Sequence, residues 1–581
     1  MFAIAALCVL AYGSSDVYDA ERVTFFSTSE ENAENADGMR FLRGEMSGSC
    51  GPNLSWTLDA DSHTLTINGT GNMIDFNSTG YPWYSNRTLI EKVVIEEGVT
   101  SIGDHAFCLC KNLTDLSIPS SVKTIGNNSF FDCQGLVSVN IPFGVISIGP
   151  QAFAWCNNLV NVSFPNSLVT IGHHSFNNCT ALKSVTFPSS LKSLEKYAFC
   201  FDSNLTSVFI PANLTFIEGD PFGSCHNLEN IEVDESNPRY KLYDDILYDT
   251  TDGILVQYLA GKKGSHFDVP DNVTIGLYAF SGCSHLTSIR VSSNITSIAN
   301  GSFSNCTGLT SLTLESNVTT IGEFAFANCT SLKSLTIPSS VTSIGPCAFQ
   351  FCESLTSLVI PPSVKSIGKF AFEYCSGLVS INISSSLTSV EPYLFLKCSS
   401  LESISIPSNV KTIGASAFEY CSSLRAVSIP LSVTSIGSYS FSRCNSLESI
   451  SIPSGVKTIG AHSFEYCISL RSVNIPSSVT SIGSYSFSRC NSLESTSIPS
   501  NVKTIETHAF DHCSSLKSVS IPSSVTSIGM YAFDYCSSLI SFTFPPPQRN
   551  INWILSVSWV QQAGVSDNPI ICYFNRIQCF L

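Results

Sequence analysis

The chain has 581 residues, of which 43% are hydrophobic and 13% are charged, and its formal net charge is −16. This composition excludes an intrinsically disordered chain, which combines low hydrophobicity with high charge. The acidic balance, without a run of clustered Lys or Arg, argues against a nucleic-acid or anionic-membrane partner.

The N-terminal segment predicts export. Residues 2–12 form an apolar run that is too short to span a bilayer and suits the core of a signal peptide. Because the usual basic residues do not precede it, a truncated gene start is the alternative. Residues 27–40 are rich in Ser, Glu and Asn. We therefore expect a signal peptide and flexible leader over 1–40.

A Phe-x-x-Cys pattern recurs every 23 residues along most of the chain, from Phe107 to Phe533. Asp202 takes the place of one Cys, and one atypical unit with a 12-residue excess separates Cys225 from Cys283. Six units before this gap and twelve after it make 18, so the chain is a tandem array. The ladder cysteines are Cys110, Cys133, Cys156, Cys179, Cys225, Cys283, Cys306, Cys329, Cys352, Cys375, Cys398, Cys421, Cys444, Cys467, Cys490, Cys513 and Cys536.

One regular unit, 332–354, shows what each repeat encodes. Its Leu-Thr-Ile alternation predicts a short strand that Pro338 ends, followed by a turn and a second extended stretch. We expect a helical turn around Ala348 and Phe349. Each coil has too small an apolar face to fold alone, so a stacked solenoid follows. The residues expected to point inward are Leu332, Leu335, Ile337, Val341, Ile344, Ala348, Phe349 and Cys352.

This unit resembles the leucine-rich repeat, and its IPxxVxxIGxxAFxxC form is similar to the BspA-like class of that family. The resemblance covers about 41–545 and implies a solenoid with a β-strand and a short helical turn in each coil. It implies repeat blocks over 99–231 and 271–545. Residues 41–98 resemble the β-rich segment that precedes such repeats, and would cap the exposed end of the solenoid.

The atypical unit, 232–270, contains two strand-like runs, 243–248 and 254–258, around an Asp-Gly turn. This arrangement is typical of a β-hairpin. It serves either as an architectural insert, which similar inserts in this repeat class favour, or as a projection that binds a partner. After the repeats, 546–581 form a non-repeat C-terminal tail without an apolar run of 18 residues.

The sequence offers little catalytic chemistry. It has no phosphate-binding Gly-rich loop, G-x-S-x-G elbow, H-E-x-x-H or paired CxxC motif, so we predict neither an enzyme nor a cofactor. His508 and His512 are spaced to share one helical face and could bind a metal. However, His512 occupies a slot that Tyr takes in other units, which favours surface packing. Asp59 and Asp61 are interpreted as turn residues rather than an acid–base pair.

The ladder cysteines are within disulfide reach of their neighbours, since stacked coils place equivalent Cα atoms roughly 5 Å apart. Parallel, in-register side chains nevertheless give poor disulfide geometry, which favours a column of buried thiols. Disulfides are more plausible among the off-ladder cysteines, whose partners the sequence does not assign. These are Cys50, Cys108, Cys200, Cys347, Cys572 and Cys579.

The last units show a second period of 46 residues. Charges of alternating sign follow the first Leu of the strand, and Tyr alternates with Arg before the ladder Cys, which permits cation–π contacts. Duplication of a two-unit block accounts for the alternation by itself and is the favoured interpretation. The two series are Glu402, Arg425, Glu448, Arg471, Glu494 and Lys517, and Tyr420, Arg443, Tyr466 and Arg489.

N-x-S/T sequons are frequent up to Asn382 and absent beyond it. Many arise by chance in a chain so rich in Ser, Thr and Asn, and they matter only in a eukaryotic secretory pathway. Asn294 and Asn317 occupy the same slot on adjacent rungs, where two glycans would crowd each other. The candidate sites are Asn68, Asn86, Asn112, Asn204, Asn294 and Asn317.

A long stacked surface without clustered reactive groups suits extended protein contact. The family resemblance implies an extracellular or cell-surface protein that adheres to host matrix or to other cells. The alternative is a structural coat component that self-associates. Neither catalytic nor metal residues are predicted, and no transmembrane span. The outward strip at Ser405, Ser428, Ser451, Asn474, Ser497 and Ser520 is the expected contact platform.

Overall fold

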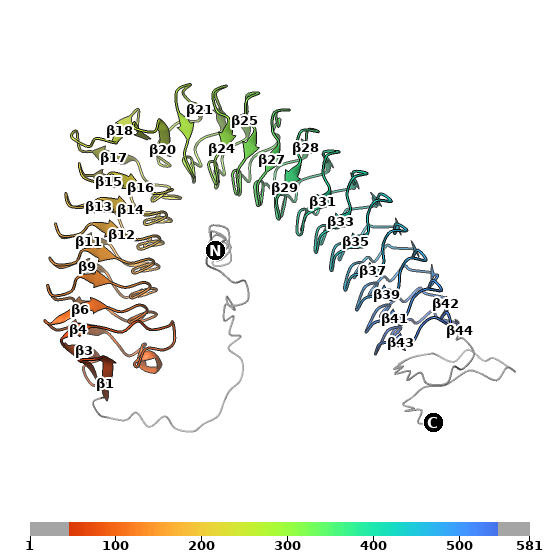
Figure 1. Ribbon diagram of the computed structural model, residues 1–581, viewed down its shortest axis with the longest axis horizontal. Coiled ribbons are helices and arrows are strands. Elements are labelled where there is room, and N and C mark those ends of the chain that lie inside the picture. Colours follow the sequence, from red (N-terminus) through yellow and green to blue (C-terminus); the bar gives the residue numbers. More distant parts are fainter. Residues whose placement is uncertain (1–45, 544–581) are drawn as a thin grey trace. The chain divides into compact units, whose positions relative to one another are not determined.

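A computed structural model describes residues 46–543, which form two compact units divided after Phe222. In each unit the chain makes one coil per repeat, and successive coils stack through parallel strands (Figure 1). Most coils carry a first and a second strand, which belong to two separate sheets. We call the outer surfaces of these sheets the first-strand face and the second-strand face. The predicted leucine-rich-repeat solenoid is confirmed.

The unit that ends at Phe222 begins with antiparallel strands. Strand β1 (Met46–Gly51) pairs with β2 (Leu54–Asp59), and β2 pairs with β3 (Thr64–Gly69). Strand β3 then runs parallel to β5 (Lys92–Ile95), the first regular rung. The antiparallel strands therefore cover an edge that a parallel sheet would otherwise leave unpaired.

The remaining elements of this unit follow the 23-residue rhythm. The first strands are β7 (Asp115–Ser117), β9 (Ser138–Asn140), β11 (Asn161–Ser163), β13 (Ser184–Thr186) and β15 (Ser207–Ile210). The second strands are β4 (Gly71–Asn72), β6 (Val99–Ile102), β8 (Thr124–Ile125), β10 (Ser147–Ile148), β12 (Thr170–Ile171), β14 (Ser193–Leu194) and β16 (Phe216–Ile217). A short 3₁₀ helix, η1 (Tyr84–Asn86), precedes β5.

The unit from Gly223 begins with β17 (Asn230–Val233) and then the atypical segment. There β18 (Tyr240–Tyr243), β19 (Ile246–Asp249) and β20 (Ile254–Tyr258) form an antiparallel meander. Strand β20 pairs in parallel with β22 (Thr274–Ile275), which joins the insert to the regular coils. The insert thus has one strand more than the predicted hairpin.

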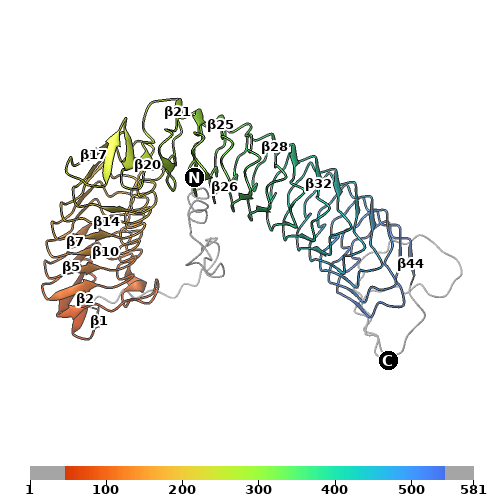
Figure 2. The same ribbon diagram turned by 45° about the horizontal axis from the view of Figure 1, so that its top comes forward.

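The regular coils of this unit run to the end of the described chain, and Figure 2 shows them from a second angle. The first strands are β21 (His266–Asp268), β23 (Ser288–Arg290), β25 (Ser311–Thr313), β28 (Ser357–Val359), β30 (Ser380–Asn382), β32 (Ser403–Ser405), β34 (Ala426–Ser428), β36 (Ser449–Ser451), β38 (Ser472–Asn474), β40 (Ser495–Thr496), β42 (Ser518–Ser520) and β44 (Ser541–Thr543). The second strands are β24 (Ser297–Ile298), β26 (Thr320–Ile321), β27 (Ser343–Ile344), β29 (Ser366–Ile367), β31 (Ser389–Val390), β33 (Thr412–Ile413), β35 (Ser435–Ile436), β37 (Thr458–Ile459), β39 (Ser481–Ile482), β41 (Thr504–Ile505) and β43 (Ser527–Ile528).

The structure corrects two details of the predicted unit. The inward residues of 332–354 are all buried, but no first strand forms before Pro338 in this coil. The bond there from the Lys333 amide to the Thr310 carbonyl is 3.5 Å long, at the limit for a hydrogen bond. The predicted helical turn at Ala348 and Phe349 is also wrong, because this segment consists of turns.

Left-handed backbone explains why no helix forms there. Cys347 and Phe351 have φ angles of 53° and 59°, and a left-handed residue interrupts a right-handed helix. The amide of Phe349 instead donates to the carbonyl of Ala371 in the next coil, at 2.8 Å. Hydrogen bonds between coils thus replace those within a helix.

A column of Phe rings forms the centre of each core. In the C-terminal unit the stack runs from Tyr258 through Phe280 to Phe533, and the rings from Phe280 onward are at most 3% exposed. Phe418, for example, lies 5.4 Å from Phe395 and 5.2 Å from Phe441, nearly parallel to both. In the N-terminal unit Trp83 stacks on Phe107 at 5.6 Å and begins the equivalent column. Such offset stacks add to the free energy gained by burial.

The ladder cysteines lie beside the Phe column. All of them are buried, as are Cys50, Cys108, Cys200 and Cys347, and the structure gives no disulfide between ladder positions in the described residues. The Cys421 thiol donates to the Phe395 carbonyl in the preceding coil at 3.2 Å, and most ladder positions repeat this bond. Burial raises the pKa of most ladder thiols, that of Cys352 to about 12.

We predict that replacing Phe418 with Ala will destabilise its coil by about 3–5 kcal/mol, because a fully buried ring is lost from the stack. Pulse proteolysis should detect new cleavage near this coil. Leu431, which is 79% exposed, provides the control, and Leu431→Ala should change stability by less than about 0.5 kcal/mol. A loss below about 1 kcal/mol for Phe418→Ala would contradict the stacking role.

The ladder thiols should resist alkylation in the native protein and react fully after denaturation, since the thiolate is the reactive form and burial suppresses it. Mass spectrometry of non-reduced peptides measures both states. A Ser451→Cys variant places an exposed thiol on the first-strand face and should react in the native protein. A disulfide between Cys421 and Cys444 would contradict the prediction.

Candidate functional site

The first-strand face of the C-terminal unit presents two regular rows of small, mostly polar side chains. In β32, β36 and β42 the middle residue is buried and the two flanking residues are exposed. Parallel pairing keeps equivalent residues in line, so that Ser403 aligns with Ala426 and Ser405 aligns with Ser428. The predicted strip from Ser405 to Ser520 is exposed at all six positions. The second row, which our sequence analysis missed, is Ser403, Ala426, Ser449, Ser472, Ser495 and Ser518.

The serine hydroxyl groups of these rows are available for hydrogen bonds to a partner. The side chains of Ser405, Ser428 and Ser451 form no hydrogen bond within the described chain. Exposed apolar side chains adjoin the rows on neighbouring rungs, at Val359 (64% exposed) and Val379 (42% exposed). The face therefore offers both hydrogen-bonding groups and apolar contact to a partner.

A line of charged residues borders the second row, because each charged residue directly precedes a residue of that row. The amide of Arg471 donates to the carbonyl of Glu448 at 2.9 Å, so oppositely charged residues stand on successive rungs as predicted. One ion pair closes along this line in the described residues, between Lys517 Nζ and Glu494 Oε2 at 2.8 Å. This hydrogen bond and the charge of Lys517 lower the pKa of Glu494. Since both groups are exposed, the pair contributes little to stability.

The predicted alternation of Tyr and Arg forms cation–π contacts. The Arg443 guanidinium lies 5.0 Å from the Tyr420 ring and 4.2 Å from the Tyr466 ring, and Arg489 lies 5.1 Å from Tyr466. These residues all have left-handed backbone, with φ near 60°. The aromatic faces are covered by their neighbours, so they are not free to stack on a ligand.

The histidines considered as metal ligands have structural partners. His508 lies between the rings of Tyr485 and Tyr531, at 4.5 and 4.9 Å, and His512 stacks on Tyr535 at 4.3 Å. Both Nδ1 atoms face Asp511, at 3.3 and 2.8 Å. The segment is a turn rather than a helix. Within 46–543 no group of three or more His, Cys, Asp or Glu side chains is arranged to hold a metal ion.

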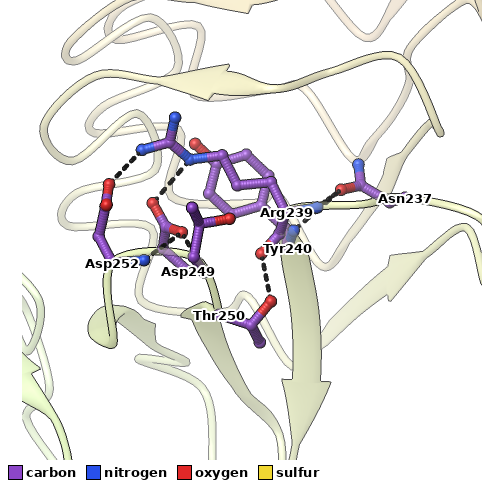
Figure 3. Close-up of polar contacts among 7 residues, drawn as sticks. Asn237, Arg239, Tyr240, Asp249, Thr250 and Asp252 are labelled. Atoms are coloured by element: carbon purple, nitrogen blue, oxygen red, sulfur yellow. Dashed lines mark hydrogen bonds and ion pairs between the residues drawn. The ribbon is translucent and has the colours of Figure 1, made fainter.

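Charged residues of the insert form ion pairs with one another (Figure 3). Arg239 lies just before β18. Its Nε pairs with Asp249 at the end of β19, at 2.8 Å, and its Nη2 pairs with Asp252 in the following turn, at 2.6 Å. The Asn237 side chain accepts bonds from the amides of Arg239 and Tyr240. These contacts brace the meander and favour the architectural interpretation over a binding projection.

Two further groups of predicted residues have local roles. Asp59 accepts hydrogen bonds from the Asp61 amide and the Ser62 hydroxyl, as a turn residue does. Asn294 and Asn317 donate their side-chain amides to main-chain carbonyls of the preceding coil, each at 2.7 Å. The predicted leader (1–40) and tail (546–581) lie outside the described residues. In the described part of the chain, no helix has the length and apolarity to cross a membrane.

Asp202 interrupts the thiol column of the N-terminal unit. Its carboxyl group is fully buried, and Oδ1 accepts a hydrogen bond from the Cys179 amide at 2.7 Å. Oδ2 has no hydrogen-bond partner. Burial raises the pKa of Asp202 well above its ordinary value, with the bond from Cys179 opposing the shift. Enclosed in the core, the group has no access to a substrate.

Comparison with known proteins identifies the repeat. A family model described as "BspA type Leucine rich repeat region (6 copies)" matches residues 77–150, 124–246, 258–358, 342–471 and 434–554. No curated protein matches the chain. Solved structures that match include a leucine-rich repeat protein of Eubacterium ventriosum, with 26% identity over 73% of this chain and 95% of the other, and a TM-score of 0.41. A leucine-rich cell surface protein of Faecalibacterium prausnitzii has 30% identity over 58% and 95%, with a TM-score of 0.49.

We predict that Asp202→Cys, which restores the column, will stabilise the N-terminal unit increasingly as pH rises. The raised pKa means that folded Asp202 keeps a proton that the unfolded chain releases from about pH 4, so stability falls with rising pH through the folded pKa. The gap between variant and wild type should widen by up to about 1.4 kcal/mol per pH unit in this window.

Urea unfolding of both proteins between pH 4 and pH 7 measures this gap, and other titrating groups cancel in the comparison. Asp202→Asn serves as the matched control, because it keeps the shape but cannot ionise. Its stability gap to the wild type should therefore widen with rising pH in the same way. A gap that stays constant with pH would show that Asp202 does not titrate in this way.

Proposed function

Because the chain belongs to the BspA-type leucine-rich repeat family, we propose that it binds other proteins outside the cell or on its surface. Adhesion to host matrix proteins or to other cells is the specific role that we propose. The observation that carries the proposal is the first-strand face, where rows of exposed hydroxyls without hydrogen-bond partners run over consecutive coils.

The size of the face favours a partner that spans several coils. A standard protein interface needs about 800 Å² from each partner, more than the few exposed residues of one coil supply. Each rung adds only about 4.8 Å along the axis, so a footprint of that size covers several rungs. Val359 and Val379 lie on adjacent first-strand rungs just before these rows and offer apolar contact of the kind that interfaces use.

Binding should decline gradually when terminal coils are deleted, since contacts that are modest per unit sum over many units. Four truncated proteins that end after Cys536, Cys490, Cys444 and Cys398 test this. Each is assayed for binding to a fibronectin-type matrix protein and to epithelial cells. Each truncated array keeps its remaining nearest-neighbour contacts and should stay folded. Light scattering must show a monomer, because oligomers that grow with concentration would favour a self-associating coat protein instead.

Point variants give a sharper control for the same prediction. Ser428→Glu combined with Ser451→Glu places charge on the proposed face and should weaken binding, whereas Ser454→Glu with Ser477→Glu alters exposed turn residues of the same region and should not. Abrupt loss of binding on deleting 232–270, with the remaining array folded, would place the site on the insert. Equal effects of both double variants would contradict a role for the first-strand face.

A further inference from the structure

The second-strand face of the C-terminal unit carries a row of lysines whose alignment is not apparent from the linear sequence. Lys365, Lys411, Lys457 and Lys503 are 46 residues apart, so the chain has no basic run. Each lysine directly precedes a second strand, at the same position in β29, β33, β37 and β41. All four side chains are exposed. We call them the lysine row.

Backbone hydrogen bonds hold the row in line. The amides of Lys411 and Lys503 donate to the carbonyls of Thr388 and Thr480 on the rung before, at 2.9 and 2.8 Å. Thr434, on the rung between two lysines, donates its hydroxyl back to the Lys411 carbonyl at 3.3 Å. Since each rung adds about 4.8 Å, neighbouring lysines stand roughly 10 Å apart.

The positive charge of the row is not compensated. None of the four ammonium groups makes an ion pair or hydrogen bond within the described chain. On the first-strand face the 46-residue period alternates Glu with Arg, so that the charges have opposite signs. On the second-strand face the same period alternates Lys with Thr, which carries no charge. Two acidic residues follow second strands in this region, Glu391 and Glu506. In the described structure they accept hydrogen bonds from Ser389 and Ser484 and pair with no lysine of the row.

Uncharged hydroxyls accompany the lysines. Ser366, Thr412 and Thr458 directly follow a lysine of the row, are exposed, and form no side-chain hydrogen bond in the described structure. The segments 361–367, 407–413, 453–459 and 499–505 contain no aromatic residue. The face thus combines widely spaced cations with hydroxyl groups and has no ring on which a base could stack.

We propose that the lysine row binds a linear acidic polysaccharide that carries about one negative charge per disaccharide. Such a polymer repeats its charge at a spacing comparable to two rungs, and its sugar hydroxyls match the serine and threonine hydroxyls beside the lysines. A nucleic-acid strand fits less well, since its charges lie about 3.4 Å apart along the axis and single strands are commonly held by aromatic stacking. The site is separate from the protein-binding face proposed above.

Hyaluronan, with one carboxylate per disaccharide, is the probe. The full chain should bind immobilised hyaluronan at low salt and release it as NaCl is raised, because salt screens exposed charges. The variant K365Q/K411Q/K457Q/K503Q should bind hyaluronan at least about tenfold more weakly, since each exposed ion pair adds a few-fold in affinity. Circular dichroism should be unchanged, because the replaced side chains are exposed.

A variant with the same loss of charge on neighbouring coils is the control. K333Q/R425Q/R471Q/K517Q removes four cations from the first-strand face and should retain hyaluronan binding. An equal loss in both variants would show that net charge alone matters and would overturn the lysine row. No binding by the wild type would overturn it as well, and so would stronger competition by oligothymidine than by free hyaluronan, which would indicate a nucleic-acid site.

Discussion

The structure depends on stacking nearly identical coils one strand spacing apart. At that distance each Phe ring meets the ring of the next coil in an offset stack, as Phe464 does with Phe487 at 5.3 Å and 7°. The thiol beside it donates to the Phe carbonyl of the previous coil, which satisfies a polar group that would otherwise be buried without a partner. Both contacts require the same residue at the same position in every coil.

The same requirement shapes the segment around the rings. Two residues in each regular coil adopt left-handed backbone, such as Tyr439 and Arg443, at a cost that an isolated turn would not recover. In the stack, the amide of Tyr439 donates to the carbonyl of Ala461 and that of Arg443 to Glu465. Every coil thus uses its neighbours to hold a conformation that its own residues disfavour, which is why the fold exists only as an array.

On the surface of such an array, equivalent residues of successive coils form rows. A period of two coils makes two residue types alternate along each row. The consequences differ between faces. Glu448 and Arg471 alternate on the first-strand face and leave it almost neutral, whereas Lys411 and Thr434 alternate on the second-strand face and leave it positive. A chain with a net charge of −16 can therefore hold a locally cationic line, and its global charge does not describe the partners of each face.

The sequence by itself determined the repeat length, the buried columns, the family and the exposed strip from Ser405 to Ser520, because a fixed 23-residue period allows one register. Tertiary structure alone decided the turns around Phe349, where bonds between coils outweigh local helix formation. It also decided the third strand of the insert. The lysine row was not predicted, because residues 46 apart become neighbours only when the coils stack. The net charge gives the number of charged residues and not their positions on the surface.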